Sequence, residues 1–594
     1  MEQDFDSSEL RDERKLMGIA ASNGIVLGNV FFISHGDIEV THYQISDSDI
    51  DNEITRLKAA LAKTREDVLA VKNEIAGRVG EAEASIFDAH LLVIEDVALI
   101  DETIRLLRET KYNVDYCYQM AVKKFIAAFG EIDDAFIRER IADIEDVSRR
   151  VINNLLGKEN SATYRLSHPK IIASSDFAPS DFALLDKSNI LGIVTEKGSQ
   201  TSHTAIMARS MKVPCIVGLS GLTEKLATND FVLVDGYSGT LFINPLKETT
   251  ERYAQVETSH KQMDVLLRTS LPSPNELKSG EKFDIDLNIS GLADLDDFSV
   301  QNSSGVGLFR TENYFINSGS FPSEEEQYNV YKSVVEKMGG KPVIIRTLDL
   351  GGDKNFALLN LSKKEQNPFM GYRAIRFCLD HEDIFMNQLR ALLRASAHGS
   401  LKIMFPMISA PSELRKAKQF LEAAKTELKT KGLPFDENVK VGMMIEVPSA
   451  AIMADIFADM CDFISVGTND LTQYMFAVDR VNDKVAYLYE PASPAMVRVL
   501  EHIAKAGSEK CPVSVCGELA SDPIFAPLLI GLGITHLSMS SSAIPEVKFL
   551  LRKITLAEAK ELAANLMQIK TARGVRGSLR EFYYMKMKDY LKLP

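Results

Sequence analysis

The sequence lacks several features that would each define a class of protein. Cysteine is scarce, with six residues in 594, and none of them forms a Cys-x-x-Cys pair or a Cys/His cluster with zinc spacing. A disulfide framework is therefore excluded, and we expect reduced thiols in a cytoplasmic protein. Apolar runs stay well short of the roughly 18 residues of a membrane-spanning helix, so we expect no membrane insertion.

The amino terminus lacks the apolar centre of a secretory signal, and we expect residues 1–16 to be a disordered extension. Positive charge is also in deficit. Lys and Arg number 68 and Asp and Glu 83, for a net charge of −15. This balance disfavours nucleic acid as a partner and favours a basic one. At 594 residues, the chain has room for about three to five domains.

The hydrophobic periodicity changes several times along the chain. Short apolar runs typical of strands occupy residues 17–45 and return in residues 160–246. Between them, residues 46–159 lack strand patterns and carry apolar residues at helical spacing. We therefore predict an all-α domain inserted into a small α/β domain. Residues 247–275 form a polar helical stretch that we interpret as a linker.

Residues 276–594 alternate strand-like runs with helical patterns. Eight such runs occur: FDIDLNIS, GVGLFRTE, PVIIRTLD, LKIMFPMI, KVGMMIEVP, DFISVGTND, PVSVCGE and HLSMSS. Eight alternating units over about 300 residues predict a (β/α)₈ barrel, whose active site lies at the carboxyl ends of its strands. Six residues with complementary chemistry fall at these ends: Arg310, Arg346, Glu446, Asn469, Asp470 and Cys516.

His203 lies in the segment GSQTSHTAIMARSMKVPCIVG, after small residues and before a helical run. This places the imidazole near a helix N-terminus, where free N–H groups and the helix dipole suit an anion. A neutral imidazole nitrogen is also a competent nucleophile toward phosphorus. By position alone, however, a capping or solvated histidine is the more common case.

The strand ends of the barrel combine arginines with hard oxygen ligands. The guanidinium fork matches both phosphate and carboxylate, which suits Arg310 and Arg346 to a phosphorylated acid. Glu446 and Asp470 suit Mg²⁺. For Arg373 and Arg376, a surface ion pair and a role in the site stay equally open.

TSHTAIMAR followed by PCIVG resembles the phosphohistidine signature of the phosphoenolpyruvate-utilising family, in which His203 matches the phosphorylated histidine. Within that family, residues 17 to about 570 are similar to enzyme I of the bacterial phosphotransferase system. Many members carry Gly-Gly-Arg before Thr-Ser-His. This chain has Gly198, Ser199 and Gln200 there, which removes one possible phosphate contact.

The resemblance implies roles for the barrel residues. Arg310, Arg346 and Arg480 match arginines that bind phosphoenolpyruvate, and Asn469 matches a contact to its phosphate. Lys354, in VIIRTLDLGGDK, joins this substrate-binding set. Glu446 and Asp470 match metal ligands for Mg²⁺. Cys516 matches the catalytic cysteine, and we expect a thiol held near neutral pKa that protonates the methylene carbon of enolpyruvate.

The resemblance also implies a reaction sequence and partners. The phosphoryl group would pass to His203 and then to a histidine of the small carrier protein HPr, with release of pyruvate, as the first step of sugar uptake. The swivelling domain that carries His203 would have to move between donor and acceptor. A homodimer through the barrel is implied too.

An acidic stretch in the helical domain is the expected docking surface. From Glu74 to Glu102, eight residues are acidic and one is basic, with apolar residues interleaved. A solvated helix face and a groove for a basic partner fit this charge equally well. The match to the HPr-binding surface of enzyme I runs through five residues: Glu81, Asp88, His90, Leu91 and Leu92.

Two alternatives remain. A pyruvate- and ATP-dependent dikinase or synthase would need a nucleotide-binding domain ahead of the phosphohistidine, and no Gly-x-x-x-x-Gly-Lys-Ser/Thr loop is present. A regulatory scaffold without catalysis would not need the intact set of His203, Arg310, Arg346, Glu446, Asp470 and Cys516.

Overall fold

The computed structural model describes most of the chain. The described residues are 13–33, 40–78, 86–130, 135–157, 168–177, 181, 189–199, 202–317, 320–351, 365, 367–480, 482, 484–507 and 511–590. These residues form two compact units, one ending at Thr258 and the other beginning at Ser259. The division falls within α10 (Lys247–Ser270), a helix in the stretch predicted to be a linker.

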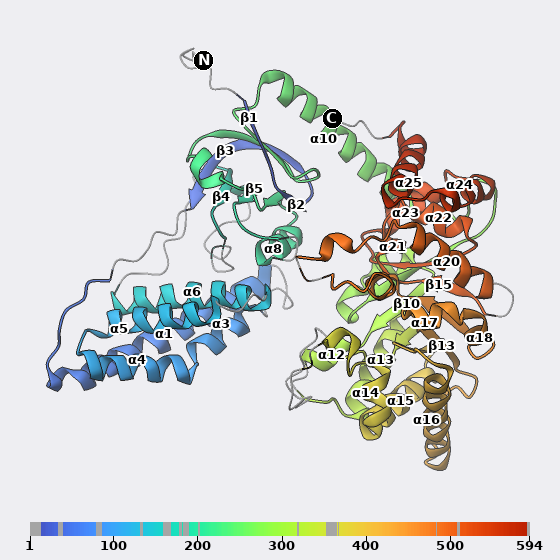
Figure 1. Ribbon diagram of the computed structural model, residues 1–594, viewed down its shortest axis with the longest axis horizontal. Helices are drawn as coiled ribbons and strands as arrows, with labels where there is room; N and C mark the ends of the chain where they lie inside the picture. Colours follow the sequence, from blue (N-terminus) through green and yellow to red (C-terminus); the bar gives the residue numbers. More distant parts are fainter. Residues whose placement is uncertain are drawn as a thin grey trace. The chain divides into compact units, whose positions relative to one another are not determined.

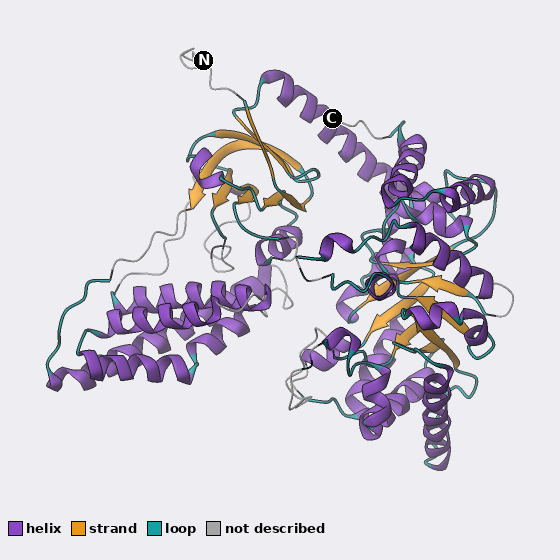
Figure 2. Ribbon diagram, in the orientation of Figure 1, coloured by secondary structure: helices purple, strands orange, loops and turns teal. Residues whose placement is uncertain are grey.

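An eight-stranded mixed sheet forms the α/β part of the first unit (Figures 1 and 2). Its strand order is β1-β8-β7-β3-β4-β5-β6-β2. The central run from β3 to β6 is parallel, and the strands outside it pair antiparallel. The strands are β1 (Arg14–Met17), β2 (Ile19–Ser22), β3 (Ile25–Ile33), β4 (Lys170–Ser174), β5 (Ile190–Thr195), β6 (Cys215–Val217), β7 (Phe231–Asp235) and β8 (Thr240–Ile243).

The first strand corrects one prediction. Residues 14–16, expected to be part of a disordered extension, belong to β1, which pairs with β8 from Arg14↔Ile243 to Met17↔Thr240. The pairing uses backbone N–H and C=O groups, and an edge strand tolerates charged side chains because one of its sides faces no other strand. Composition alone therefore misplaced the start of the sheet. The rest of the predicted extension, residues 1–12, lies outside the described residues.

A helical block is inserted between β3 and β4 (Figure 1). Within the described residues, its helices are α1 (Ile50–Arg78), α3 (Ile86–Ile94), α4 (Val97–Thr110), α5 (Val114–Gly130) and α6 (Ala135–Leu155). Helix α1 packs against α3 and α6, and α5 packs against α4 and α6. Two short helices belong to the α/β part, α8 (His203–Met211) and α9 (Leu222–Lys225).

The second unit is a closed barrel of eight parallel strands, with each predicted strand present (Figure 2). The strands are β9 (Asp284–Ile289), β10 (Gly305–Arg310), β11 (Val343–Arg346), β12 (Leu401–Phe405), β13 (Lys440–Ile445), β14 (Phe463–Val466), β15 (Val513–Val515) and β16 (His536–Met539). The predicted fold class is therefore confirmed, whereas the finer domain boundaries stay predictions.

Helices surround the barrel. They are α11 (Asp297–Asn302), α12 (Glu312–Asn317), α13 (Glu324–Lys337), α14 (Ile375–Asp380), α15 (Glu382–Ser396), α16 (Pro411–Thr430), α17 (Pro448–Ile452), α18 (Ala454–Ala458), α19 (Thr468–Met475), α20 (Pro494–Gly507), α21 (Glu518–Ser521), α22 (Ala526–Gly531), α23 (Ile544–Leu551), α24 (Leu556–Gln568) and α25 (Ala572–Met587). The outward residues of the strands and the inner faces of these helices form one large apolar core.

Asp286 of β9 is a buried acid of the barrel. Space around it is tight, since a Cβ on Gly307 would lie 2.4 Å from Ser538 Oγ and 3.0 Å from Asp286 Cβ. Burial raises the pKa of Asp286 to about 7, and the charge of Asp284 adds to this effect. The neutral acid is thus the form that the folded barrel favours.

This burial predicts a pH dependence of stability. Because the folded pKa lies above the unfolded value of about 3.9, the contribution of Asp286 is greatest below pH 4 and is lost as pH rises through about 7. In denaturant titrations, the free energy of unfolding of Asp286→Asn should rise relative to that of the wild type as pH increases across this range, by up to about 4 kcal/mol. The exposed Asp297→Asn variant should show no such rise in the free energy of unfolding. If unfolding free energy depended on pH in the same way in all three proteins, the raised pKa of Asp286 would be contradicted.

Candidate functional site

A cavity of about 220 Å³ lies at the carboxyl ends of the barrel strands. Arg310 and Arg346 end β10 and β11, Glu446 follows β13, and Cys516 follows β15. Asn469 and Asp470 lie in the first turn of α19, directly after β14. The cavity is lined by Ser290, Leu308, Arg310, Glu312, Asn313, Arg346, Asp349, Phe369, Arg373, Met444, Glu446, Gly467, Asn469, Asp470, Arg480, Cys516, Gly517 and Glu518. Every described barrel residue that the sequence singled out for substrate or metal binding lies in this lining.

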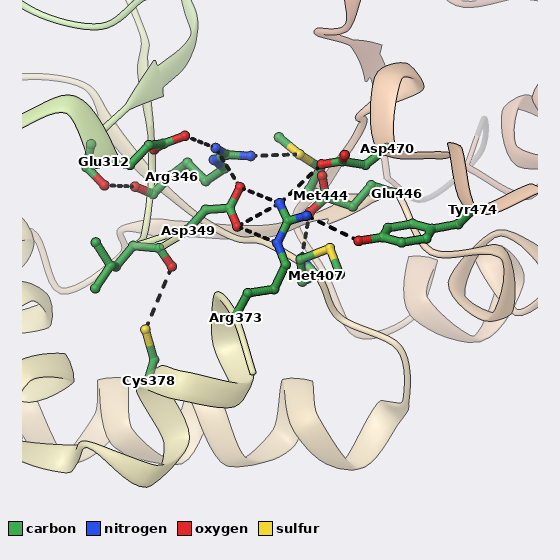
Figure 3. A network of polar contacts seen from close by, with 12 residues as sticks. Glu312, Arg346, Asp349, Arg373, Cys378, Met407, Met444, Glu446, Asp470 and Tyr474 are labelled. Carbon is green, nitrogen blue, oxygen red and sulfur yellow. Dashed lines mark hydrogen bonds and ion pairs between the residues drawn. The ribbon is translucent and has the colours of Figure 1, made fainter. Parts of the chain in front are cut away.

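Arg346 is a buried cation held by two carboxylates (Figure 3). Its guanidinium donates to Glu312 and lies 2.9 Å from Asp349 Oδ2, while Nη1 reaches Met444 Sδ at 3.6 Å. Burial by itself lowers the pKa of Arg346, but the two neighbouring carboxylates outweigh it and raise the pKa above its usual value. Within the described residues, Nε of Arg346 has no hydrogen-bond partner.

Arg310 contributes a cation of a different kind. Its side chain is half-buried at the end of β10 and lines the same cavity. It makes no hydrogen bond or ion pair with any residue that the structure describes. An arginine in a cavity without a carboxylate partner is available to an anionic ligand.

Arg373, whose role the sequence left open, belongs to the site. It is buried, donates to Asp349 Oδ1 at 3.0 Å, and reaches Asp470 Oδ2 at 3.3 Å. Its Nη1 donates to the Tyr474 hydroxyl at 3.1 Å (Figure 3). Arg376 instead donates to the carbonyls of Met370 and Gly371, outside the cavity lining.

Glu446 is buried and close to a second acid. The N–H of Met407 donates to its Oε1 at 2.6 Å. Burial and, second, the nearby charge of Asp470 together raise the pKa of Glu446 to about 8, against the opposing effect of Arg346. Two carboxylates that repel each other in a water-poor cavity favour either a shared proton or a bound cation.

Asn469 and Arg480 line the cavity from the α19 side. Asn469 Nδ2 donates to Glu518 Oε1 at 2.9 Å, and the N–H of Glu518 donates back to Asn469 Oδ1 at 2.9 Å. The N–H of Arg480 donates to Gln473 Oε1 at 3.2 Å. These bonds hold the segments after β14 and β15 together at the mouth of the cavity.

Cys516 is buried beneath the arginines. Asn288 Nδ2 donates to its carbonyl at 2.9 Å, and Sγ donates to the carbonyl of Val466 at 3.7 Å. Burial raises the pKa of the thiol above its usual value. This corrects the expectation of a near-neutral pKa: because the thiolate is poorly solvated here, the thiol keeps its proton at neutral pH.

His203 begins α8 in the first unit, as its sequence setting predicted. Ser202 is the N-cap, and its Oγ accepts from the N–H of Ala205 at 3.4 Å. Thr204 Oγ1 donates to the carbonyl of Phe177 at 3.0 Å, which ties the first turn of the helix to the preceding loop. Gln200 and Lys354 lie outside the described residues.

The predicted docking residues are divided between two faces of α3. Leu92 is 64% exposed, and Asp88 is exposed and forms a 2.5 Å ion pair with Lys72. Leu91 is half-buried, whereas Glu81 lies outside the described residues. A shallow cavity of about 100 Å³ lies beside Leu92 and is also lined by Ala89, Val93, Asp96, Leu99, Phe125, Asp143 and Ile144.

His90 contradicts its predicted place on the docking surface. It is fully buried, with Nε2 3.1 Å from Asp143 Oδ1. The helical period explains the error, since Phe87, His90 and Ile94 share the inward face of α3 while Asp88 and Leu92 point outward. The contiguous stretch from Asp88 to Leu92 therefore does not form one surface.

The sequence reasoning did not single out three residues of the site. Asp349 joins Arg346 to Arg373, Tyr474 accepts from Arg373, and Met444 contacts Arg346. Asp349 follows the end of β11 by only three residues, a signal that could have identified it. Tyr474 and Met444 are ordinary residues of a helix and a strand, and nothing in their spacing distinguishes them.

The hydroxyl of Tyr474 joins two parts of the site. It donates to the carbonyl of Phe369 at 2.5 Å while accepting from Arg373. Removing it in Tyr474→Phe leaves a buried arginine donor without its acceptor, which should lower the free energy of unfolding of the barrel by about 1–3 kcal/mol in a denaturant titration. Tyr487→Phe, at a ring that is 78% exposed, is the matched control. Equal stability of the two variants would show that the bond contributes nothing.

No helix in the described part of the chain is long and apolar enough to span a membrane.

Comparison with known proteins gives a consistent family. Three family models match the chain: "PEP-utilising enzyme, N-terminal" over residues 17–140, "PEP-utilising enzyme, mobile domain" over residues 166–239, and "PEP-utilising enzyme, PEP-binding domain" over residues 266–556. A solved solution structure of an Enzyme I protein is 32% identical, covers 41% of this chain and 99% of its own, and has a TM-score of 0.35.

Curated relatives match over nearly their whole length. The phosphoenolpyruvate-protein phosphotransferase of Geobacillus stearothermophilus is 39% identical over 95% of this chain and 97% of its own. That of Mycoplasma capricolum is 39% identical over 96% of this chain and 99% of its own. The family predicted from the motifs is confirmed: the chain belongs to the PEP-utilising enzyme family.

Proposed function

We propose that this enzyme transfers the phosphoryl group of phosphoenolpyruvate to His203 and then to a histidine of a small HPr-like carrier protein, with release of pyruvate. The observation that carries the proposal is Arg310, which lacks an ion pair within the described residues and lines one cavity with Arg346 and Cys516. A phosphorylated carboxylic acid has two anionic ends, and guanidinium groups can pair with both.

We infer that Mg²⁺ completes the site, held by Glu446 and Asp470. The donor set supports this, since Glu446 and Asp470 are two mutually repelling carboxylates on one cavity and a bound cation would relieve that repulsion. Mg²⁺ commonly uses one or two protein carboxylates and takes substrate oxygens as further ligands, and it would neutralise charge on the phosphoryl group.

In the proposed first step, the His203 imidazole attacks phosphorus. An N–P bond forms while the bond between phosphorus and the enol oxygen breaks, and the arginines stabilise the charge that develops. Cys516 then donates its proton to C3 of the enolate, which gives pyruvate. A thiol that stays protonated at neutral pH is suited to this role.

His203 and the cavity belong to different compact units, so the transfer requires these units to approach each other. The start of α8 suits the phosphorylated imidazole, because the helix dipole and free N–H groups favour negative charge there. The second transfer would occur at the helical block. Exposed Asp88 and Leu92 beside the shallow cavity offer an acidic and apolar surface for a basic carrier protein.

Three wider features belong to the same proposal. The enzyme would act in the cytoplasm, form a homodimer through the barrel, and provide the first step of phosphoryl transfer for sugar uptake. A dikinase-like enzyme and a regulatory scaffold are the competing functions. The former would be labelled from ATP, whereas the latter would accept no label.

Labelling of the full-length protein separates these functions. We expect ³²P from labelled phosphoenolpyruvate to appear on the wild-type chain in the presence of Mg²⁺, with loss of at least about 100-fold in His203→Ala because the nucleophile is gone. His168→Ala, an exposed histidine in the same unit, is the matched control and should label normally. Equal labelling of the His203→Ala variant, or labelling from ATP alone, would overturn the proposal.

A further inference from the structure

We propose that Leu308 and Met444 form a rigid apolar wall around C3 of the substrate and thereby determine specificity against enol phosphates that carry a substituent on that carbon. This inference rests on the proposed function, because it concerns the carbon that Cys516 protonates. It concerns the choice of substrate, and it adds no step to the chemistry.

The position of C3 follows from the position of the proton donor. A general acid must lie within hydrogen-bond reach of the atom that it protonates. The carboxylate and phosphate ends of the substrate are drawn to the arginines, which leaves C3 as the uncharged end that faces Cys516. The groups beside Cys516 in the cavity are therefore the groups that contact C3.

Apolar side chains make up one part of the surroundings of Cys516. Its thiol belongs to a buried cluster inside the barrel with Leu308, Ile344, Met404, Met444 and Phe463. Of these five neighbours, only Leu308 and Met444 also line the cavity. The two residues therefore form the boundary between the cavity and the barrel interior at the point where Cys516 lies.

Met444 cannot readily withdraw from this boundary. Arg346 Nη1 lies 3.6 Å from its Sδ on one side. On another side is the backbone of Gly467, where an added Cβ would lie 2.9 Å from the same sulfur atom. Met is normally the most adaptable core side chain, but here two neighbours fix its thioether.

Leu308 is fixed by its strand. Its chain neighbour Gly307 packs so closely on β16 that a Cβ there would lie 2.6 Å from Ser538 Cβ. On the other side of Leu308, Phe309 pairs with Ile289 of β9 and Ile345 of β11. The register of β10 is irregular between Val306 and Phe309, but these contacts anchor the strand on either side of Leu308. A larger ligand would therefore meet the side chains of Leu308 and Met444.

A wall at this position should discriminate against substrates that carry one extra carbon on C3. A wall of fixed side chains distinguishes ligands that differ by one methylene by about 10- to 200-fold. The enol phosphate of 2-oxobutyrate carries one methyl group on C3 and is otherwise identical to phosphoenolpyruvate. We expect the wild-type enzyme to prefer phosphoenolpyruvate by a factor in this range.

The test compares the two substrates in single-turnover assays that follow release of the 2-oxo acid by the full-length enzyme with Mg²⁺. Met444→Ala should shift the ratio of the two second-order rate constants for 2-oxo acid release toward the methylated substrate by about 10-fold or more. Leu308→Val, a smaller truncation that preserves the barrel if Met444→Ala fails to fold, should shift the ratio in the same direction. Met404→Ala is the matched control, because Met404 belongs to the apolar cluster but does not line the cavity.

Two results would refute the proposal that Leu308 and Met444 form this wall. One is a wild-type enzyme that uses both substrates equally well, and the other is a ratio that moves as far in Met404→Ala as in the two wall variants. Turnover of phosphoenolpyruvate by the wild type tests the proposed function independently of the apolar wall. Its absence would refute that function, whereas normal turnover with an unchanged ratio would refute the wall alone.

Discussion

The site depends on the compensation of buried arginines by Asp349. This carboxylate lies 2.9 Å from Arg346 and 3.0 Å from Arg373, and all three side chains are buried (Figure 3). A buried guanidinium without a partner is strongly unfavourable. The shared carboxylate compensates both arginines, together with Glu312 for Arg346 and Asp470 for Arg373. The network fixes the end of β11 and the turn before α14 relative to each other, and through Asp470 it reaches α19.

Only part of the positive charge at the site is available to a ligand, because carboxylates of the network already engage the rest. Arg346 and Arg373 are largely engaged by carboxylates, whereas Arg310 has no ion pair with the described residues and Arg346 Nε has no partner among them. Glu446 lies nearby with its pKa raised by burial and by Asp470. A cavity arranged in this way presents free donors to an anion and a carboxylate pair to a cation.

Much of the architecture could be predicted from the sequence because its signals are local. Most barrel strands are short apolar runs that end in, or are followed by, polar residues, and parallel strands bring those ends together, which is why Arg310, Glu446 and Cys516 share one cavity. Sequence patterns were not sufficient where the outcome depends on tertiary contacts. Arg373 could not be distinguished from a surface arginine, His90 turned inward toward Asp143, and residues 14–16 joined a sheet through backbone bonds with β8.

We propose that this cavity binds phosphoenolpyruvate with its methylene carbon toward Cys516. A crystal structure of the His203→Ala variant soaked with phosphoenolpyruvate and Mg²⁺ is the sharpest test, because loss of the proposed nucleophile should prevent turnover. We expect the ligand within hydrogen-bond distance of Arg310 and Arg346, the metal ion on Glu446 and Asp470, and C3 beside the sulfur of Cys516. A ligand bound outside the cavity, or bound inside it with C3 directed away from Cys516, would refute this binding mode.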